Sequence, residues 1–363
     1  MWWVILIIFA TIILYFLIWP VPIDPIAWES PSNTAYIGKL SSNNRLKALK
    51  FFSIGHNHGP EDIAIDAKGF IYTSTHAGNI VRLQPNGYNP ENWANTGGRP
   101  LGIEFDHEGN LIVADAYRGL LSITPGGEII ELATMADGVP IRYANNLDVA
   151  LDGKIYFTDS STKFGAEEWG GTYKASLLDI IEHGAHGRLL VYDPSSGEVK
   201  TLLKGLNFPN GVAVSHDQTY ILVNETGSYK IMRYWIDGLK RGQVEVFINE
   251  LPSFPDNISR GLCGRFWVAL ISPRNPVLDK LSGNPFMRKV VQRLPLFLKP
   301  KAASYGHIIA IDGEGNILED LQDPHGKYPM NTSVIETKDY LYIGSLVAPF
   351  LARLSKKRSG LLL

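Results

Sequence analysis

The stretch GLNFPNGVAVSHDQTYILVNET, residues 205–226, decides the fold. It predicts a short strand over residues 211–214, a polar tight turn over 215–219 and a second strand over 220–223. Val, Ile and Tyr dominate both strands and the turn is polar, which is the pattern of a β-hairpin. Asn210 stands directly before the first strand. A single hairpin of this kind buries too little apolar surface to be stable alone, so it needs neighbours.

Five further stretches repeat the order of apolar strand, short polar turn and apolar strand. They are EDIAIDAKGFIYTST from Glu61, LGIEFDHEGNLIVAD from Leu101, NLDVALDGKIYFTDS from Asn146, DNISRGLCGRFWVAL from Asp256 and TSVIETKDYLYIGSL from Thr332. Six similar units at spacings of roughly 40 to 75 residues predict an all-β fold, a six-bladed β-propeller. A β-sandwich also contains short, regularly spaced strands, but sixfold self-similarity favours the propeller.

Closure of the ring needs a strand from outside the repeats, because the last copy supplies only two or three strands. The segment LKALKFFSI, residues 46–54, precedes the first copy and is apolar enough to complete the last blade. The propeller is therefore expected to span residues 45–356, followed by a short tail over 357–363.

Composition favours one large domain and excludes some partners. The chain has 363 residues, with 34 basic and 36 acidic side chains, and a net charge of −2. This balance gives no reason to expect nucleic acid as a partner. The lone Cys263 excludes an intramolecular disulfide.

Residues 1–19, MWWVILIIFATIILYFLIW, carry no charged side chain. The length is close to that of a transmembrane helix, Trp residues lie at both ends, and neither a basic start nor a cleavage site is present. The sequence therefore predicts a retained single-pass membrane anchor and a proline-containing stalk over residues 20–44. The charges after the anchor favour a propeller on the external, periplasmic or lumenal side.

Residues 274–301 form a basic, amphipathic insertion. Seven basic residues alternate there with apolar ones, and Asp279 is the single acidic residue. This pattern is typical of a segment that binds a bilayer surface. It equally suits a lid helix packed over one face of the ring, and the two alternatives are compatible.

Polar residues at the start of the innermost strands are expected to converge at one mouth of the central channel. Glu61, Asn146, Asn210, Asp256 and Asn257 occupy this position in four of the six copies. Carboxylate and amide oxygens are the ligands that Ca²⁺ prefers, whereas Zn²⁺ prefers His or Cys. The sequence therefore predicts a Ca²⁺ site. Any one of these residues alone is better explained as a turn cap.

The stretches GPEDIAID, RPLGI, VADAYRGLL, NNLDVALDGKIYFTD, FPNGVAVS, FPDNIS and YLYIGS resemble the strictosidine synthase-like branch of the calcium-dependent phosphotriesterase superfamily. That superfamily includes paraoxonases, gluconolactonases and senescence marker protein-30. The resemblance covers roughly residues 45 to 355 and implies that Glu61, Asn146, Asn210 and Asp256 bind the catalytic metal, with Asn257 beside them. It also matches Asp62 to a ligand of a second, structural calcium.

Two departures from the family limit the reaction. Leu101 stands where paraoxonases carry a catalytic histidine, and Thr332 stands where true strictosidine synthases carry a catalytic glutamate. The resemblance then implies hydrolysis of small esters or lactones, not amine–aldehyde condensation. Asp256 is the expected nucleophile or general base, and His58 the expected proton shuttle.

Other residues and another function stay open. His56, His76 and His107 are alternative shuttles, and Asp115 and Tyr117 either face the substrate or end a strand. The alternative function is a non-catalytic propeller with a structural calcium, whose faces bind a protein or a glycan.

Overall fold

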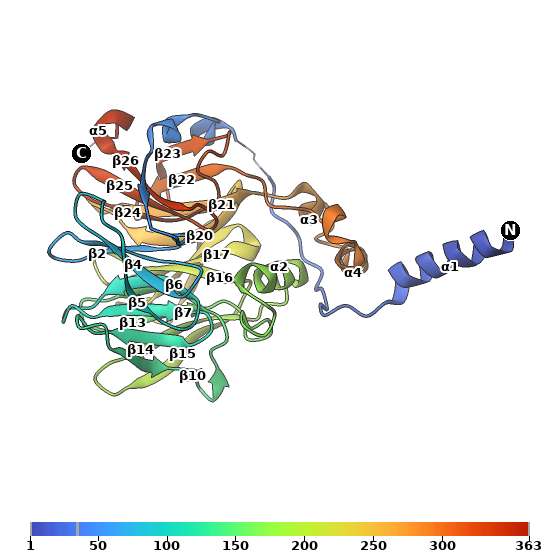
Figure 1. Ribbon diagram of the computed structural model, residues 1–363. Helices are drawn as coiled ribbons and strands as arrows, with labels where there is room; N and C mark the ends of the chain where they lie inside the picture. Colours follow the sequence, from blue (N-terminus) through green and yellow to red (C-terminus); the bar gives the residue numbers. More distant parts are fainter. Residues whose placement is uncertain (1, 34–35, 362–363) are drawn as a thin grey trace.

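Four-stranded antiparallel sheets recur six times around a central axis in the computed structural model, which describes residues 2–33 and 36–361 (Figure 1). Within each sheet the strands follow one another in chain order, except in the last. The six-bladed propeller predicted from the hairpin repeat is therefore confirmed.

The first three blades follow the order of the repeats. Blade one contains β2 (Ile63–Ile65), β3 (Ile71–Ser74), β4 (Asn79–Leu83) and β5 (Glu91–Asn95); blade two contains β6 (Pro100–Phe105), β7 (Leu111–Asp115), β8 (Gly119–Ile123) and β9 (Ile129–Ala133); blade three contains β12 (Ala144–Val149), β13 (Ile155–Asp159), β14 (Gly187–Asp193) and β15 (Glu198–Leu206). A small hairpin of β10 (Met135–Ala136) and β11 (Val139–Pro140) precedes blade three.

The other three blades complete the ring. Blade four contains β16 (Pro209–Val214), β17 (Tyr220–Glu225), β18 (Lys230–Trp235) and β19 (Val244–Ile248); blade five contains β20 (Ser253–Arg260), β21 (Phe266–Pro273), β22 (Gly306–Ile311) and β23 (Ile317–Asp323); blade six contains β24 (Asn331–Glu336), β25 (Tyr340–Ser345), β26 (Phe350–Ser355) and β1 (Lys50–Ser53). Apolar clusters fill the spaces between neighbouring blades, as between blades three and four, where Leu189 packs with Val212 and Val223.

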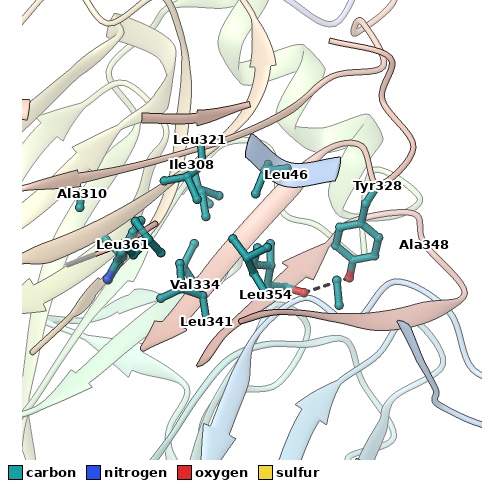
Figure 2. Packing of buried hydrophobic residues seen from close by; sticks show 14 residues of the cluster. Leu46, Ile308, Ala310, Leu321, Tyr328, Val334, Leu341, Ala348, Leu354 and Leu361 are labelled. Atoms are coloured by element: carbon teal, nitrogen blue, oxygen red, sulfur yellow. Dashed lines mark hydrogen bonds between the residues drawn. The ribbon is translucent and has the colours of Figure 1, made fainter. Parts of the chain in front are cut away.

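The ring closes as the sequence predicts. Strand β1, within residues 46–54, pairs antiparallel with β26, from Lys50 opposite Arg353 to Ser53 opposite Phe350. Just before it, η2 (Arg45–Ala48) places Leu46 among Leu321, Val334 and Leu354, between blades five and six (Figure 2). Burial of one such leucine contributes about 2 kcal/mol. The closing strand is shorter than the apolar segment because residues 45–48 form a 3₁₀ turn.

The expected membrane anchor and the single-pass localisation built on it are wrong. The apolar segment forms α1 (Trp2–Ile18), which projects away from the propeller (Figure 1). In residues 2–33 and 36–361 no helix is both long and apolar enough to cross a membrane. The 17 residues of α1 span about 25 Å at 1.5 Å per residue, less than the roughly 30 Å of a bilayer core. The helix ends before Pro20, which lacks the N–H needed to continue it.

The sequence suggests a stalk over residues 20–44. Within it, residues 20–33 and 36–44 run along the propeller (Figure 1) and are called the strap below. In the first half of the strap, Ile23 is buried in a cluster with Leu101, Tyr143 and Phe208. Further along, Trp28 stacks on His183 with ring centroids 4.0 Å apart. The strap therefore covers apolar side chains at the start of the inner strands of blades two to four.

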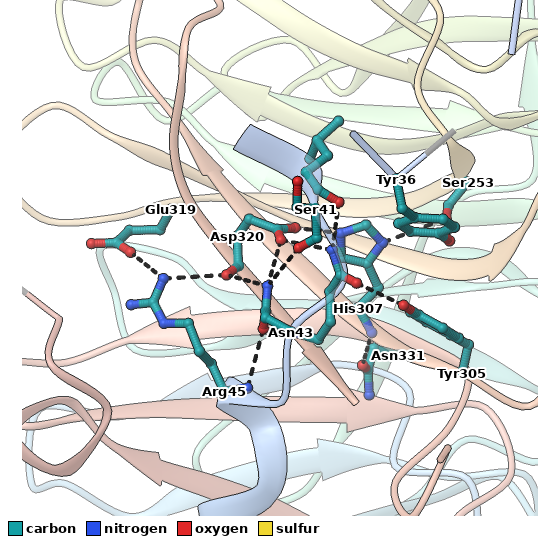
Figure 3. Close-up of polar contacts among 12 residues, drawn as sticks. Tyr36, Ser41, Asn43, Arg45, Ser253, Tyr305, His307, Glu319, Asp320 and Asn331 are labelled. Atoms are coloured by element: carbon teal, nitrogen blue, oxygen red, sulfur yellow. Dashed lines mark hydrogen bonds and ion pairs between the residues drawn. The ribbon is translucent and has the colours of Figure 1, made fainter. Parts of the chain in front are cut away.

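The second half of the strap is fixed to blade five by buried polar groups (Figure 3). The Tyr36 hydroxyl lies 2.9 Å from the Ser253 hydroxyl, and Asn43 donates to the Asp320 carboxylate at 2.7 Å. His307 also contacts Asp320, with Nε2 at 2.7 Å from Oδ1. Because Ser253 and His307 are fully buried, this cluster holds the strap in place.

Helices α2 (Thr172–Glu182), α3 (Pro276–Lys280) and α4 (Pro285–Arg293) lie on the same side of the molecule as the strap (Figure 1). Two arginines of α4, within the basic insertion, point inward rather than to solvent. Arg288 donates to the carbonyl oxygens of Ile181 and Ser282, and Arg293 donates to that of Trp19. This packing is that of a lid helix; binding to a bilayer surface stays a prediction. At the C-terminus, the short helix α5 (Lys356–Ser359) follows β26.

Candidate functional site at the channel mouth

Five inner strands shift register at the same point, where the sequence places its polar residues. The shifts lie between Pro100 and Ile103, Ala144 and Leu147, Pro209 and Val212, Pro255 and Ile258, and Asn331 and Val334. A β-bulge frees backbone groups from the ladder and redirects side chains, and bulges are common beside active sites. Glu61 and Asp62 occupy the matching place directly before β2. The repeat therefore builds a ring of redirected residues.

Glycine lets the inner strands of blades four and five approach closely at this ring. A Cβ on Gly211 would lie 2.4 Å from the Ile258 nitrogen and 2.6 Å from the Asp256 carbonyl oxygen. Any larger residue would force the two strands apart. This contact brings Asn210 beside Asp256 although they are far apart in sequence.

Three of the predicted ligands present side-chain oxygens with no hydrogen-bond partner in the described residues. They are Oδ1 of Asn210, Asp256 and Asn257, all on residues at most 5% exposed. Leaving a buried acceptor unpaired costs about 1–3 kcal/mol. Burial, and then the charge of Glu61, raise the pKa of Asp256 well above its usual range, while a hydrogen bond from Asn210 opposes the rise. Three such oxygens form an acceptor-rich site suited to a cation.

Glu61 and Asn146 have protein partners instead. Glu61 Oε2 accepts from Arg99 Nη2 at 3.0 Å, and this ion pair is buried. Arg99 is also held by Pro100, whose carbonyl oxygen accepts from Nη1 at 2.9 Å. Asn146 Oδ1 accepts from the Val212 backbone N–H at 2.9 Å. Burial raises the pKa of Glu61, although Arg99 opposes the rise.

The residues therefore fit Ca²⁺ in part. In the described ranges no group of three or more His, Cys, Asp or Glu side chains is placed to hold a metal ion. The oxygen atoms that remain available to a cation belong instead to one carboxylate and two amides. Oxygen donors of this kind suit a hard cation such as Ca²⁺. The structure thus brings the side chains of Asn210 and Asp256 together, leaves an unpaired Oδ1 on each of these two residues and on Asn257, and leaves Glu61 and Asn146 engaged.

Asp62, matched by resemblance to a second calcium site, is held by backbone. Its two carboxylate oxygens accept from Ile63 and Ile103 N–H groups at 2.9 and 3.0 Å. Burial raises its pKa to about 7. An acid already satisfied by two amides has less capacity for a metal.

The contacts of the histidines named in the sequence are with other groups than the predicted ligands. His58 is exposed and stacks on His76 with centroids 4.8 Å apart, and its side chain contacts none of the predicted ligands. His76 Nε2 lies 2.7 Å from the Leu346 carbonyl oxygen, and burial, followed by Arg99, lowers its pKa to about 4. His107 contacts the Ala150 carbonyl oxygen, and His56 is exposed. A role of His58 as proton shuttle stays a prediction.

Asp115 and Tyr117, the two remaining sequence candidates, end a strand. Asp115 Oδ1 accepts from the backbone N–H groups of Arg99, Tyr117 and Arg118. Leu101 and Thr332, the two departures from the family pattern, make different contacts. Leu101 adds an apolar wall next to the ring, and the Thr332 hydroxyl donates to the Glu61 carbonyl oxygen at 2.6 Å.

Sequence reasoning missed three residues that shape the channel. Arg99 pairs with Glu61, Asn224 adds another unpaired buried Oδ1, and Arg260 lies away from the mouth with Glu104 and Asp148. Asn224 faces the bulge at Asn210 from the second strand of the same hairpin. Its position in the repeat therefore indicates that it lies near the predicted ligands. Arg99 is the first residue of the RPLGI stretch, which resembles the family but whose spacing does not point to an ion pair.

Comparison with known proteins supports the family and the fold. A family model described as strictosidine synthase matches residues 145–239, and one described as strictosidine synthase-like, N-terminal, matches residues 38–83. Adipocyte plasma membrane-associated protein of Rattus norvegicus is 34% identical over 360 residues, which are 92% of this chain and 93% of the relative. A strictosidine synthase-like protein of Arabidopsis thaliana is 36% identical over 330 residues, which are 89% and 86% of the two chains.

Two solved structures share the fold at low identity. A gluconolactonase of Xanthomonas campestris superposes with a TM-score of 0.63 and 17% identity, covering 85% of this chain and 88% of that one. A calcium-binding protein, regucalcin, of Agrobacterium tumefaciens gives 0.58 and 15%, covering 84% and 93%. Full-length similarity to the curated relatives, with both family matches, shows that the chain belongs to the strictosidine synthase-like family.

Proposed function

We propose that this propeller hydrolyses small, fairly apolar esters or lactones with the help of Ca²⁺ at the channel mouth. One observation carries the proposal: the Oδ1 atoms of Asn210, Asp256 and Asn257 are buried and have no hydrogen-bond partner in the described residues. Apolar side chains beside the site, Leu101 and Phe208 among them, suit an apolar acyl or aryl group. The fold shared with a gluconolactonase and with a calcium-binding regucalcin supports the same class of activity.

Asn210, Asp256 and Asn257 would hold the cation, which when bound would polarise the carbonyl oxygen of the substrate. Asp256 would then act as general base. It removes a proton from water, the water oxygen bonds to the carbonyl carbon, and the acyl C–O bond breaks. The proton passes to the departing alkoxide, so an acid and an alcohol, or one hydroxy acid from a lactone, are formed.

An assay with phenyl acetate and a small lactone tests this function. We expect turnover in Ca²⁺, loss of turnover in excess chelator, and recovery when Ca²⁺ is restored. Asp256→Asn is expected to lower kcat by about 100-fold, the scale of a lost general base. Asp152→Asn, which changes an exposed turn carboxylate, is the matched control. Full turnover in chelator would contradict the proposal.

A non-catalytic propeller is the second candidate, and a specific observation favours it. The strap residue Ile23 packs on Leu101, Tyr143 and Phe208, and the polar residues beneath are at most 5% exposed. Such a covered site suits a structural cation. If the protein binds Ca²⁺ but turns over neither ester nor lactone, this second function is the correct one.

A further inference from the structure

We propose that the cation site is built by blades four and five alone, from Asn210, Asn224, Asp256 and Asn257, and that Arg99 replaces a cation at Glu61. The ligand is a divalent cation of the Ca²⁺ type. The inference deepens the proposed function and rests on it for the identity of the cation. It differs from the family-derived ligand set by adding Asn224 and removing Glu61 and Asn146.

Asn224 shares the environment of the three predicted donors. It lies on β17 and is fully buried, its Nδ2 donates to the Asp256 carbonyl oxygen at 2.6 Å, and its Oδ1 has no partner in the described chain. The amide is therefore fixed at one end and free at the other. A fixed, buried and unpaired acceptor next to Asp256 is suited to ligation.

The backbone that carries the four donors is fixed from several sides. The Asn210 carbonyl oxygen accepts from the Thr158 hydroxyl at 2.6 Å, and that of Pro255 accepts from the Thr226 hydroxyl at 2.6 Å. Gly211 packs directly on the Asp256 backbone. Because these contacts fix both strands, the four donors need little rearrangement to bind a cation.

Glu61 is unsuited to the same ion because Arg99 already neutralises it. The two charged groups are 3.0 Å apart, with side chains 3% and 7% exposed. A divalent cation placed on Glu61 would meet a buried guanidinium of like charge, which disfavours binding. A cation held by blades four and five needs no ligand from this pair, although the charge of Glu61 still reaches Asp256.

The test is a calorimetric titration of the full-length protein with Ca²⁺ after removal of metal by chelator. We expect Asn224→Ala and Asp256→Asn to weaken binding at least 10-fold, and Glu61→Gln, which removes a nearby charge but no ligand, to weaken it by less than 10-fold. Arg99→Gln is expected to tighten binding about 10-fold, since the repelling charge is lost. Asn257→Asp is also expected to tighten it, because added ligand charge raises Ca²⁺ affinity.

Thermal unfolding of each variant checks the fold, and the double variant Glu61→Gln with Arg99→Gln replaces either single variant that fails to fold. The proposal is overturned if the parent binds no Ca²⁺, or if Glu61→Gln loses binding while Asn224→Ala keeps it. The second result would leave the proposed hydrolase intact. If the binding pattern is as expected but no ester is hydrolysed, the hydrolase fails and the cation site stands.

Discussion

The channel mouth and the Arg260 cluster use the same chemistry in different ways. At the mouth, one arginine pairs with Glu61 and leaves several amide and carboxylate oxygens of blades four and five unpaired. In the Arg260 cluster, Arg260 of blade five reaches Glu104 of blade two and Asp148 of blade three at 3.2 and 2.7 Å. Asp148 also accepts from the Val214 N–H, and Glu104 from the Val149 N–H.

This difference separates a stabilising cluster from a candidate binding site. In the Arg260 cluster, Arg260 and backbone N–H groups bind both carboxylates, so the geometry gives no indication of a ligand. At the mouth, several buried oxygens of blades four and five have no hydrogen-bond donor among the described residues. The lesson is that buried charge alone does not mark function, whereas buried acceptors without donors do.

The largest expected effect is on stability. Arg99→Met should lower the free energy of unfolding by about 3 kcal/mol, because it leaves Glu61 buried without a partner. Arg260→Met should cost less than this, since the Arg260 and Glu104 side chains are 27% and 34% exposed and solvent screens their charges, although Asp148 stays buried. Urea titration of both variants measures the difference. Equal losses would show that the two clusters are energetically alike.

The second effect is stabilisation by the cation. At a Ca²⁺ concentration 100 times Kd, the parent should gain about 2.7 kcal/mol of stability by mass action. Asp256→Asn should lose most of this gain. Asp148→Asn, which changes the buried acid of the Arg260 cluster, should keep it even if the variant is less stable overall. Unfolding with Ca²⁺ and with chelator measures each gain, and a lost gain in Asp148→Asn would contradict the contrast.

The sequence predicted the ring and the convergence of residues at the start of its inner strands, but not the hydrogen-bond partners of those residues. The hairpin repeat fixes both, because equivalent residues of a propeller must converge; Asn210 and Asp256 do contact. The pairing of Glu61 with Arg99 depends on how the side chains of two neighbouring blades are turned, which no spacing encodes. Likewise, nineteen uncharged residues suggested a membrane span, whereas the helix ends at Ile18, two residues before Pro20.

The third effect is a pH dependence in the Arg260 cluster. Burial, and then Asp148, raise the pKa of Glu104 well above its usual range. The folded state therefore keeps a proton that the unfolded state releases, so this contribution is fully present below about pH 4.3 and is lost as pH rises towards the folded pKa. Glu104→Gln cannot titrate and should become progressively more stable relative to the parent above that pH.

Partial exposure of Glu104 limits the size of this slope. One proton corresponds to at most about 1.4 kcal/mol per pH unit, and screening at a side chain 34% exposed should keep the slope well below this limit. Urea titrations of both proteins from pH 4 to pH 8 measure it. A constant difference in stability across this range would show that Glu104 ionises normally.

The smallest effect on global stability is expected in the strap, where Ile23 is buried and Ile26 is 55% exposed. Ile23→Ala removes the side chain that packs on Leu101 and Phe208 and should lower the free energy of local strap opening by about 2 kcal/mol. Limited proteolysis within residues 20–44 should then be about 30-fold faster, while the global free energy of unfolding should fall by less than about 0.5 kcal/mol, because the blades do not depend on the strap. Ile26→Ala should leave the cleavage rate unchanged. If Ile23→Ala lowers global stability by the full 2 kcal/mol and leaves cleavage unchanged, the strap unfolds only with the propeller, and the channel mouth stays covered in the folded protein. Faster cleavage means instead that the strap opens on its own, which gives ligands a route to Asp256.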